Sequence, residues 1–104
     1  MPLYGAIGTN MRLIEQQMNI AIHAGNDWSK DNTSVVHYGS SCVCIYLHGH
    51  NIANYNRKND TLQINLDTLA QWPTATTKSR LRALGVNVYT RKGITYVNDK
   101  EVTQ

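Results

Sequence analysis

The sequence predicts an α+β domain in which a largely antiparallel sheet carries two helices on one face. Four short runs with strand-like composition follow one another, separated by turn-forming residues. An amphipathic helical segment precedes these runs, and a second helical segment separates them from two more. The predicted order is therefore α-β-β-β-β-α-β-β. We expect the 104 residues to form a single domain.

The first predicted helix spans about residues 10–24. Thr9 or Asn10 can cap its start, and Gly25 or Asn26 ends it. Its apolar residues recur at steps of three and four positions: Met11, Ile14, Met18 and Ala21. Polar residues occupy the opposite face: Arg12, Glu15, Gln16 and Asn19.

A polar loop over residues 26–33 leads from this helix to the predicted meander. Its four strands are Ser34–Tyr38, Ser41–His48, Asn51–Tyr55 and Asp60–Leu66. The second strand alternates, with Val43, Ile45 and Leu47 on one face. Glycine, asparagine and aspartate residues supply the turns, so consecutive strands are expected to pair antiparallel.

The second predicted helix spans about residues 75–84, within Trp72-Pro-Thr-Ala-Thr-Thr-Lys-Ser-Arg-Leu-Arg-Ala-Leu-Gly85. Pro73 biases the residue before it away from helical dihedrals, so the helix begins after it. Threonine oxygens can cap the first turn, and Gly85 can end the helix in a left-handed conformation. We expect the basic residues to lie on its exposed sides: Lys78, Arg80 and Arg82.

A hairpin follows the second helix, with strands Val86–Thr90 and Ile94–Asn98 around Lys92-Gly93. Its first strand is expected to run back beside the helix, so that its turn returns Arg91 and Lys92 toward the helix start. The tail from residue 100 to 104 is expected to fray. The predicted core comprises the apolar faces of these elements: Ile14, Met18, Val43, Ile45, Leu47, Leu62, Ile64, Leu81 and Leu84.

Composition excludes several classes of protein. No apolar run approaches the ~18 residues of a membrane span, and residues 1–8 are an irregular lead-in without the features of a signal peptide. Cys42 and Cys44 lie on the same face of a strand, where they cannot easily form a disulfide. Without a second pair they also fall short of a zinc signature. We expect both to be reduced, which favours a cytoplasmic location.

The net charge of +3 is unevenly distributed. Between Arg57 and Lys92, seven basic residues face two acidic ones, which gives +5. The rest of the chain has three basic and five acidic residues, which gives −2. Such an asymmetry is expected for a protein with a polyanionic partner, although ordinary surfaces also show it.

The sequence contains no complete catalytic set or metal site. His48 and His50 flank Gly49 at a predicted turn, and His37 lies on the strand next to it. Histidines at this spacing can bind a metal or transfer protons, but no acidic neighbour completes a ligand set. We interpret them as ordinary turn histidines. The hydroxyls near residue 77 have no base to activate them, so we predict neither enzymatic activity nor a cofactor.

Two segments resemble a group of small phage-encoded proteins. They are Leu47-His-Gly-His-Asn-Ile-Ala53 and Trp72-Pro-Thr-Ala-Thr-Thr-Lys-Ser-Arg-Leu-Arg-Ala-Leu84. The group's pattern is roughly Leu-His-Gly-Asn-x-Ile-Ala, then Gly-Trp-x-Thr-x-Thr-Thr-x-Ser-Arg-Leu-Asn-Ala-Leu. This chain departs from it at His50, Gln71 and Arg82. The resemblance implies a phage origin, a location in the host cytoplasm and a shared fold, but no mechanism.

Our leading hypothesis is a small, non-enzymatic phage accessory protein that binds nucleic acid. Free N–H groups, hydroxyls and cations at the start of the second helix can converge on a phosphate, although the same residues also suit a capped, solvated helix. The residues expected to bind are Thr76, Thr77, Lys78, Arg80, Arg82, Arg91 and Lys92. Tyrosines of the strands could stack bases, although core packing explains them as well: Tyr38, Tyr46, Tyr55, Tyr89 and Tyr96.

The alternative is a modulator or inhibitor that binds a host or phage protein and that could itself form a homodimer through an exposed sheet or helix surface. In that case Ser34–Tyr38, as an edge strand, would supply the contact.

Overall fold

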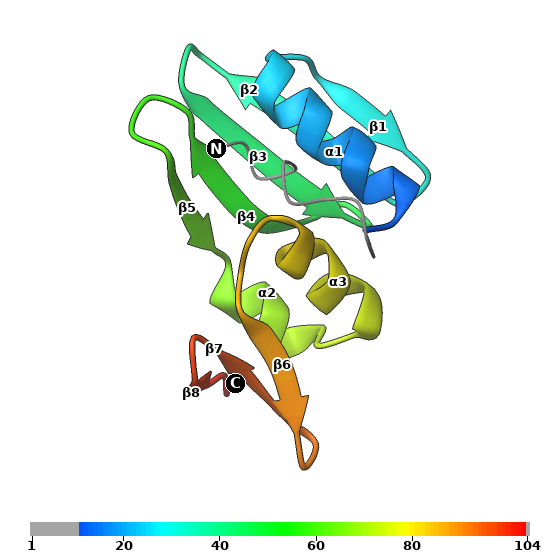
Figure 1. The fold of residues 1–104 in the computed structure, drawn as a ribbon, viewed down its shortest axis with the longest axis vertical. Coiled ribbons are helices and arrows are strands. Elements are labelled where there is room, and N and C mark those ends of the chain that lie inside the picture. Colours follow the sequence, from blue (N-terminus) through cyan, green and yellow to red (C-terminus); the bar gives the residue numbers. More distant parts are fainter. Residues whose placement is uncertain (1–10, 104) are drawn as a thin grey trace.

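The computed structural model describes residues 11–103 (Figure 1). In chain order its elements are α1 (Leu13–Ala24), β1 (Trp28–Lys30), β2 (Thr33–Tyr38), β3 (Cys42–Leu47), β4 (His50–Asn56), β5 (Thr61–Ile64), α2 (Leu66–Gln71), α3 (Ala75–Ala83), β6 (Val88–Arg91), β7 (Ile94–Val97) and β8 (Lys100–Glu101). The lead-in over residues 1–8 and the caps expected at Thr9 or Asn10 lie outside the described residues.

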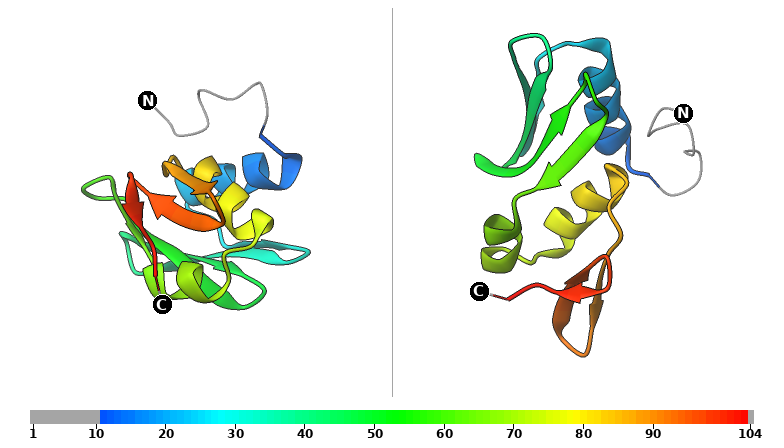
Figure 2. Two further views of the ribbon diagram at one scale, coloured as in Figure 1. Left: turned by 90° about the horizontal axis from the view of Figure 1, so that it is seen from below. Right: turned by 90° about the vertical axis from the view of Figure 1, so that its left-hand side faces the viewer.

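The first five strands form one antiparallel sheet in the order β1-β2-β3-β4-β5. Helix α1 lies across one face of this sheet, and the second view of Figure 2 shows no described helix on the other face. Alternation along β2 and β3 places Val35, Val43 and Ile45 on the covered face, each fully buried. They form the core with Met18 and Ile22 of α1.

The last three strands form a second, smaller antiparallel sheet in the order β6-β7-β8. Lys92 and Gly93, the central residues of the β6–β7 turn, have φ of 52° and 78°. Positive φ at both positions suits the twist of a two-residue hairpin, and glycine adopts it without steric cost. Figure 1 shows this sheet beyond α2 and α3, away from the five-stranded sheet.

The α+β class and the antiparallel pairing are confirmed, as is the second predicted helix, which is α3. The structure differs by having two sheets and three helices in its described part. The unpredicted elements are all short: β1 lies in the expected polar loop, β8 in the expected frayed tail, and α2 has six residues. None is long enough to show a hydrophobic period, so each forms through its tertiary neighbours.

Two positional expectations are corrected. Strand β2 is not an edge strand, because β1 pairs with it from Trp28↔Val35 to Lys30↔Thr33. Six of the nine predicted core residues are buried: Met18, Val43, Ile45, Leu47, Leu81 and Leu84. Ile14, Leu62 and Ile64 are only partly buried. Leu62 and Ile64 belong to β5, which ends its sheet and has a neighbouring strand on one side alone.

Candidate nucleic-acid interface and adjoining pocket

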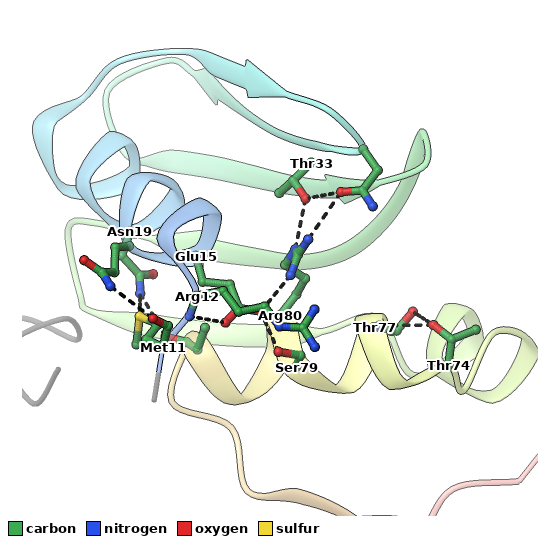
Figure 3. A network of polar contacts seen from close by, with 12 residues as sticks. Met11, Arg12, Glu15, Asn19, Thr33, Thr74, Thr77, Ser79 and Arg80 are labelled. Carbon is green, nitrogen blue, oxygen red and sulfur yellow. Dashed lines mark hydrogen bonds and ion pairs between the residues drawn. The ribbon is translucent and has the colours of Figure 1, made fainter. Parts of the chain in front are cut away.

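Arg80, which we expected on an exposed basic face, lies in a buried polar network between α1 and α3 (Figure 3). Its Nη1 lies 2.7 Å from Glu15 Oε2, and its Nε donates to Thr33 Oγ1 at 3.0 Å. Ser79 Oγ also donates to Glu15 Oε2, at 2.6 Å. Only 3% of Arg80 is exposed. Arg80 was expected to be exposed, and this was wrong because Glu15 pairs with it. Glu15 was assigned to the solvent-facing side of the first helix, but that side packs against α3.

Lys78 is also withdrawn from the surface. It is 8% exposed, and its Nζ donates to Thr90 Oγ1 of β6. Thr77 is 2% exposed, and its backbone N–H donates to Thr74 Oγ1 at 3.1 Å. Figure 3 shows these two threonines directed toward each other at the start of α3. Thr77, Lys78 and Arg80 are therefore not exposed at the start of α3 as expected, because their polar groups bond within the fold.

Three of the predicted nucleic-acid-binding cations are exposed: Arg82, Arg91 and Lys92. Arg82 Nε donates to the carbonyl oxygen of Val88 at 2.8 Å, near the end of α3 and the start of β6. The Lys78–Thr90 contact lies closer to the N-terminus of α3 and closer to the C-terminal end of β6. Together the two contacts show that β6 runs antiparallel beside α3. The β6–β7 turn thus returns toward the N-terminal end of α3, as expected.

The outward face of this hairpin carries an aromatic pair. Tyr89 and Tyr96 are opposite each other in the β6–β7 register, with ring centroids 5.2 Å apart and planes inclined by 12°. Strand alternation puts Arg91 on the same face as Tyr89. A hydrogen bond of 2.9 Å from the Tyr89 hydroxyl to Asp99 raises the pKa of Tyr89. The hairpin therefore presents stacked rings beside a guanidinium.

The other tyrosines lie elsewhere. Tyr38 and Tyr46 are on β2 and β3, on the face of the large sheet opposite α1, where 52% of Tyr38 is exposed. Tyr55 is buried in the core, and its hydroxyl donates to Asp60. The core-packing alternative therefore applies to Tyr55.

A pocket of about 300 Å³ lies where the β3–β4 turn meets α2 and the start of α3. Its apolar lining comes from Leu47 and Ile52, and its aromatic lining from His48, His50 and Trp72. Threonine hydroxyls complete it: Thr68, Thr74, Thr76 and Thr77. The His50 and Trp72 rings are stacked, with centroids 5.5 Å apart and an interplanar angle of 27°. The two segments that resemble phage proteins thus meet in one pocket.

A β-bulge and two asparagines bring these segments together. The β3–β4 register shifts at Ile45/Tyr46, and the residue without a partner there is Ile52, which is 2% exposed. Asn51 Nδ2 donates to the carbonyl oxygens that flank the bulge, on Ile45 and Ala53, at 3.3 and 3.2 Å. Asn51 Oδ1 accepts a hydrogen bond from Asn65 Nδ2 at 3.2 Å.

Asn65 then positions α2. Its side chain accepts a hydrogen bond from the Thr68 backbone N–H at 3.1 Å and so caps the helix. Its backbone N–H donates to the carbonyl oxygen of Ile52 at 2.9 Å. The last turn of α2 consequently holds Trp72 beside His50. Asn51 and Asn65 were not among the predicted site residues, although Asn65, three residues before Thr68, has the spacing of a helix cap.

None of the residues that line the pocket is Asp, Glu, Lys or Arg. His37 does not join them: its Nδ1 lies 3.2 Å from Asp27 Oδ1, and its backbone N–H also donates to that oxygen. Among residues 11–103 no cluster of three or more His, Cys, Asp or Glu side chains could hold a metal ion. In the same residues no helix is long and apolar enough to cross a membrane.

The fold and its surfaces define a small α+β protein with a concave aromatic pocket and a basic hairpin. Residues 11–104 match the model of the Kyanoviridae Gp96 protein family. The chain therefore belongs to this family of phage proteins, which confirms the phage origin implied by the two segments. No curated protein and no solved structure matches it. The family name states no activity.

Proposed function

We propose that this phage protein is a non-enzymatic accessory protein that binds nucleic acid through the β6–β7 hairpin and the adjacent end of α3. The observation that carries the proposal is the antiparallel return of β6 beside α3, which gathers the exposed cations around a stacked tyrosine pair. Lys78, Arg80 and Thr77 have no place in this interface, because they are buried.

The cations of the turn are available for phosphate. Arg91 and Lys92 form no ion pair with any residue in 11–103, and both are exposed. The acidic residues of the small sheet, Asp99 and Glu101, lie at or after the β7–β8 turn rather than in the β6–β7 turn. The hairpin is therefore positive at the turn that approaches the start of α3. Arginine and lysine at such a turn supply affinity that is independent of sequence.

The tyrosine pair suits a single strand better than a duplex. Unpaired bases stack on exposed aromatic rings, and every base offers a π face. Tyr89 is oriented by its bond to Asp99, so the stack is held in place before binding. Contacts of this kind need no catalytic group, which agrees with an accessory role.

The test is fluorescence anisotropy with a labelled single-stranded oligonucleotide across a salt series. The double variant Arg91→Ala/Lys92→Ala should weaken binding and shallow the slope of log K against log salt by about 1.4, because each phosphate contact on a single strand contributes ~0.7. The matched control is Arg57→Ala/Lys58→Ala, an exposed basic pair of equal charge near the β4–β5 turn. An equal loss of affinity in both variants would show that the oligonucleotide does not bind specifically at the β6–β7 hairpin. Wild-type protein that binds nothing at low salt would refute the proposal.

A second function is favoured by one observation, the open face of the five-stranded sheet. Val36 and Tyr38 of β2 and Cys44 and Tyr46 of β3 alternate onto the face that no described helix covers. This semi-apolar face suits contact with another protein, and a second copy of this chain is the simplest occupant. Sedimentation equilibrium tests it: a dimer should persist at high salt and dissociate in Tyr38→Glu. A monomer at all concentrations would exclude the homodimer.

A further inference from the structure

We propose that the pocket between the β3–β4 turn and α2 receives one unpaired nucleobase. This inference rests on the proposed nucleic-acid binding and names the part of the ligand that a second site recognises. The volume of about 300 Å³ is at the lower end for small-molecule pockets, so it suits one ring system rather than an extended ligand.

The pocket provides apolar and aromatic surface for a flat ring. Leu47 and Ile52 are 4% and 2% exposed and present aliphatic groups. Trp72 remains 44% exposed although it stacks on His50, so indole surface is still available to a ligand. A base adjacent to Trp72 would extend the existing stack, and stacking of this kind accepts any base.

The hydroxyls offer hydrogen bonds to the polar edge of a base. Thr74 and Thr77 are engaged with each other at the helix start. The side chains of Thr68 and Thr76 form no hydrogen bond with another residue in 11–103. Each of these two hydroxyls can both donate and accept, which matches the mixed edge of a nucleobase.

Charge distinguishes the base from other groups. The lining has no carboxylate for a cationic ligand and no lysine or arginine for a phosphate. A neutral ring therefore fits the pocket, while the phosphates of the strand stay outside it. The basic turn lies at the same end of α3: Lys78 contacts Thr90 of β6, and Thr76 and Thr77, two and one positions before Lys78, line the pocket. A strand held by the hairpin can thus present one base to the pocket.

The first test compares a single-stranded oligonucleotide with an abasic strand of the same length and charge. The wild type should bind the abasic strand at least about five- to 150-fold more weakly, the range for loss of one stacked base, because the tyrosine pair loses its stacked bases as well. Trp72→Ala should lower affinity for the ordinary strand within that range and leave the salt slope unchanged, because no phosphate contact is lost. Trp72→Phe should retain part of the affinity. The control Leu66→Ala alters a similarly exposed residue, which belongs to α2 and lies outside the pocket, and it should change nothing.

Equal affinity for both strands, with no effect of Trp72→Ala, would overturn the base site while phosphate binding survives. A second measurement reads the pocket without phosphate: adenosine, which carries no charge, should shift the NMR methyl signals of Leu47 and Ile52 and the Trp72 indole signal in the intact chain. Ribose alone should not. Absence of shifts with adenosine would refute the inference. Larger shifts with N-acetyl-tyrosinamide would also refute it and would indicate that the pocket binds a protein side chain.

Discussion

Glu15 and Arg80 form an ion pair of 2.7 Å, in which each side chain is no more than 4% exposed. The pair joins α1 to α3, and Arg80 also reaches Thr33 at the start of β2. Three elements therefore meet at one guanidinium, whose planar donors suit several fixed acceptors. Arginine is often found on binding surfaces, but here Arg80 helps to hold the fold together.

Arg80→Ala should destabilise the fold by about 3–5 kcal/mol, because it leaves the Glu15 carboxylate buried without its partner. Arg82→Ala, two positions away and exposed, should cost only about 1 kcal/mol for its hydrogen bond to Val88. Urea denaturation of both variants measures the difference. Replacing both members, in Glu15→Leu/Arg80→Met, should restore much of the loss. Similar, small costs for Arg80→Ala and Arg82→Ala would contradict the buried network.

Ile45→Ala should cost about 2–5 kcal/mol, because Ile45 is fully buried in the sheet beneath α1. Ile64→Ala should cost less, since Ile64 is only partly buried on β5 at the end of the sheet. The free energy of unfolding from denaturant titration gives both values. Equal costs for the two variants would contradict the position of β5 at the edge of the sheet.

Alkaline pH should weaken the fold through Tyr55. Burial, followed by the hydrogen bond to Asp60, raises the pKa of Tyr55 to about 12 from an ordinary value of 10.0. The folded state therefore keeps the proton that the unfolded state loses first. The stabilisation from this group is complete below pH 10 and is lost as the pH rises toward about 12.

The Tyr55→Phe variant has no phenol to titrate at this position. Its stability should fall less than that of the wild type over this pH range, as measured by thermal unfolding at successive pH values. Tyr96→Phe provides the control, because the Tyr96 hydroxyl has no hydrogen-bond partner among residues 11–103. Parallel pH profiles for the wild type and Tyr55→Phe would show that the raised pKa of Tyr55 does not contribute to the pH dependence of stability.

Cys42 and Cys44 should both be reduced thiols with different reactivities. Their sulfur atoms are 4.0 Å apart, so they are not bonded. Burial, with the neighbouring Cys42, raises the pKa of Cys44, which lowers its thiolate fraction at neutral pH. Exposed Cys42 should therefore react first with a disulfide reagent. Reaction rates of Cys42→Ser and Cys44→Ser identify each thiol, and stoichiometric zinc in the purified protein would contradict this assignment.

Much of the fold followed from short-range chemistry in the chain. Period-two alternation placed Val43 and Ile45 on the inner face of β3, and Pro73, Thr74 and Gly85 delimited α3 within one residue. These features depend on local sterics, capping and turn preference, which operate within a few residues. The return of β6 beside α3 followed in the same way, because a short connection leaves the chain little choice of direction.

The candidate site was predicted in part. The exposed cations Arg82, Arg91 and Lys92 are near the surface expected for them, but Lys78 and Arg80 are not. Basic residues spread around a helix without a clear apolar stripe do not reveal which side another helix will cover. The pocket was not predicted, because its lining comes from three segments that Asn51 and Asn65 align across the fold.

The amino-acid order was therefore sufficient for the α+β class, the main strands and two of the helices, since each depends on periodicity or on a cap beside it in the chain. Tertiary structure alone decided that Arg80 is buried with Glu15, that Ile52 turns inward at a bulge and that Trp72 stacks on His50. The partners in the Glu15–Arg80 and His50–Trp72 contacts are 65 and 22 positions apart, and they meet only when the helices pack on the sheet. Whether a residue is buried depends on the neighbours that pack around it. The residue type determines only how much free energy that burial costs.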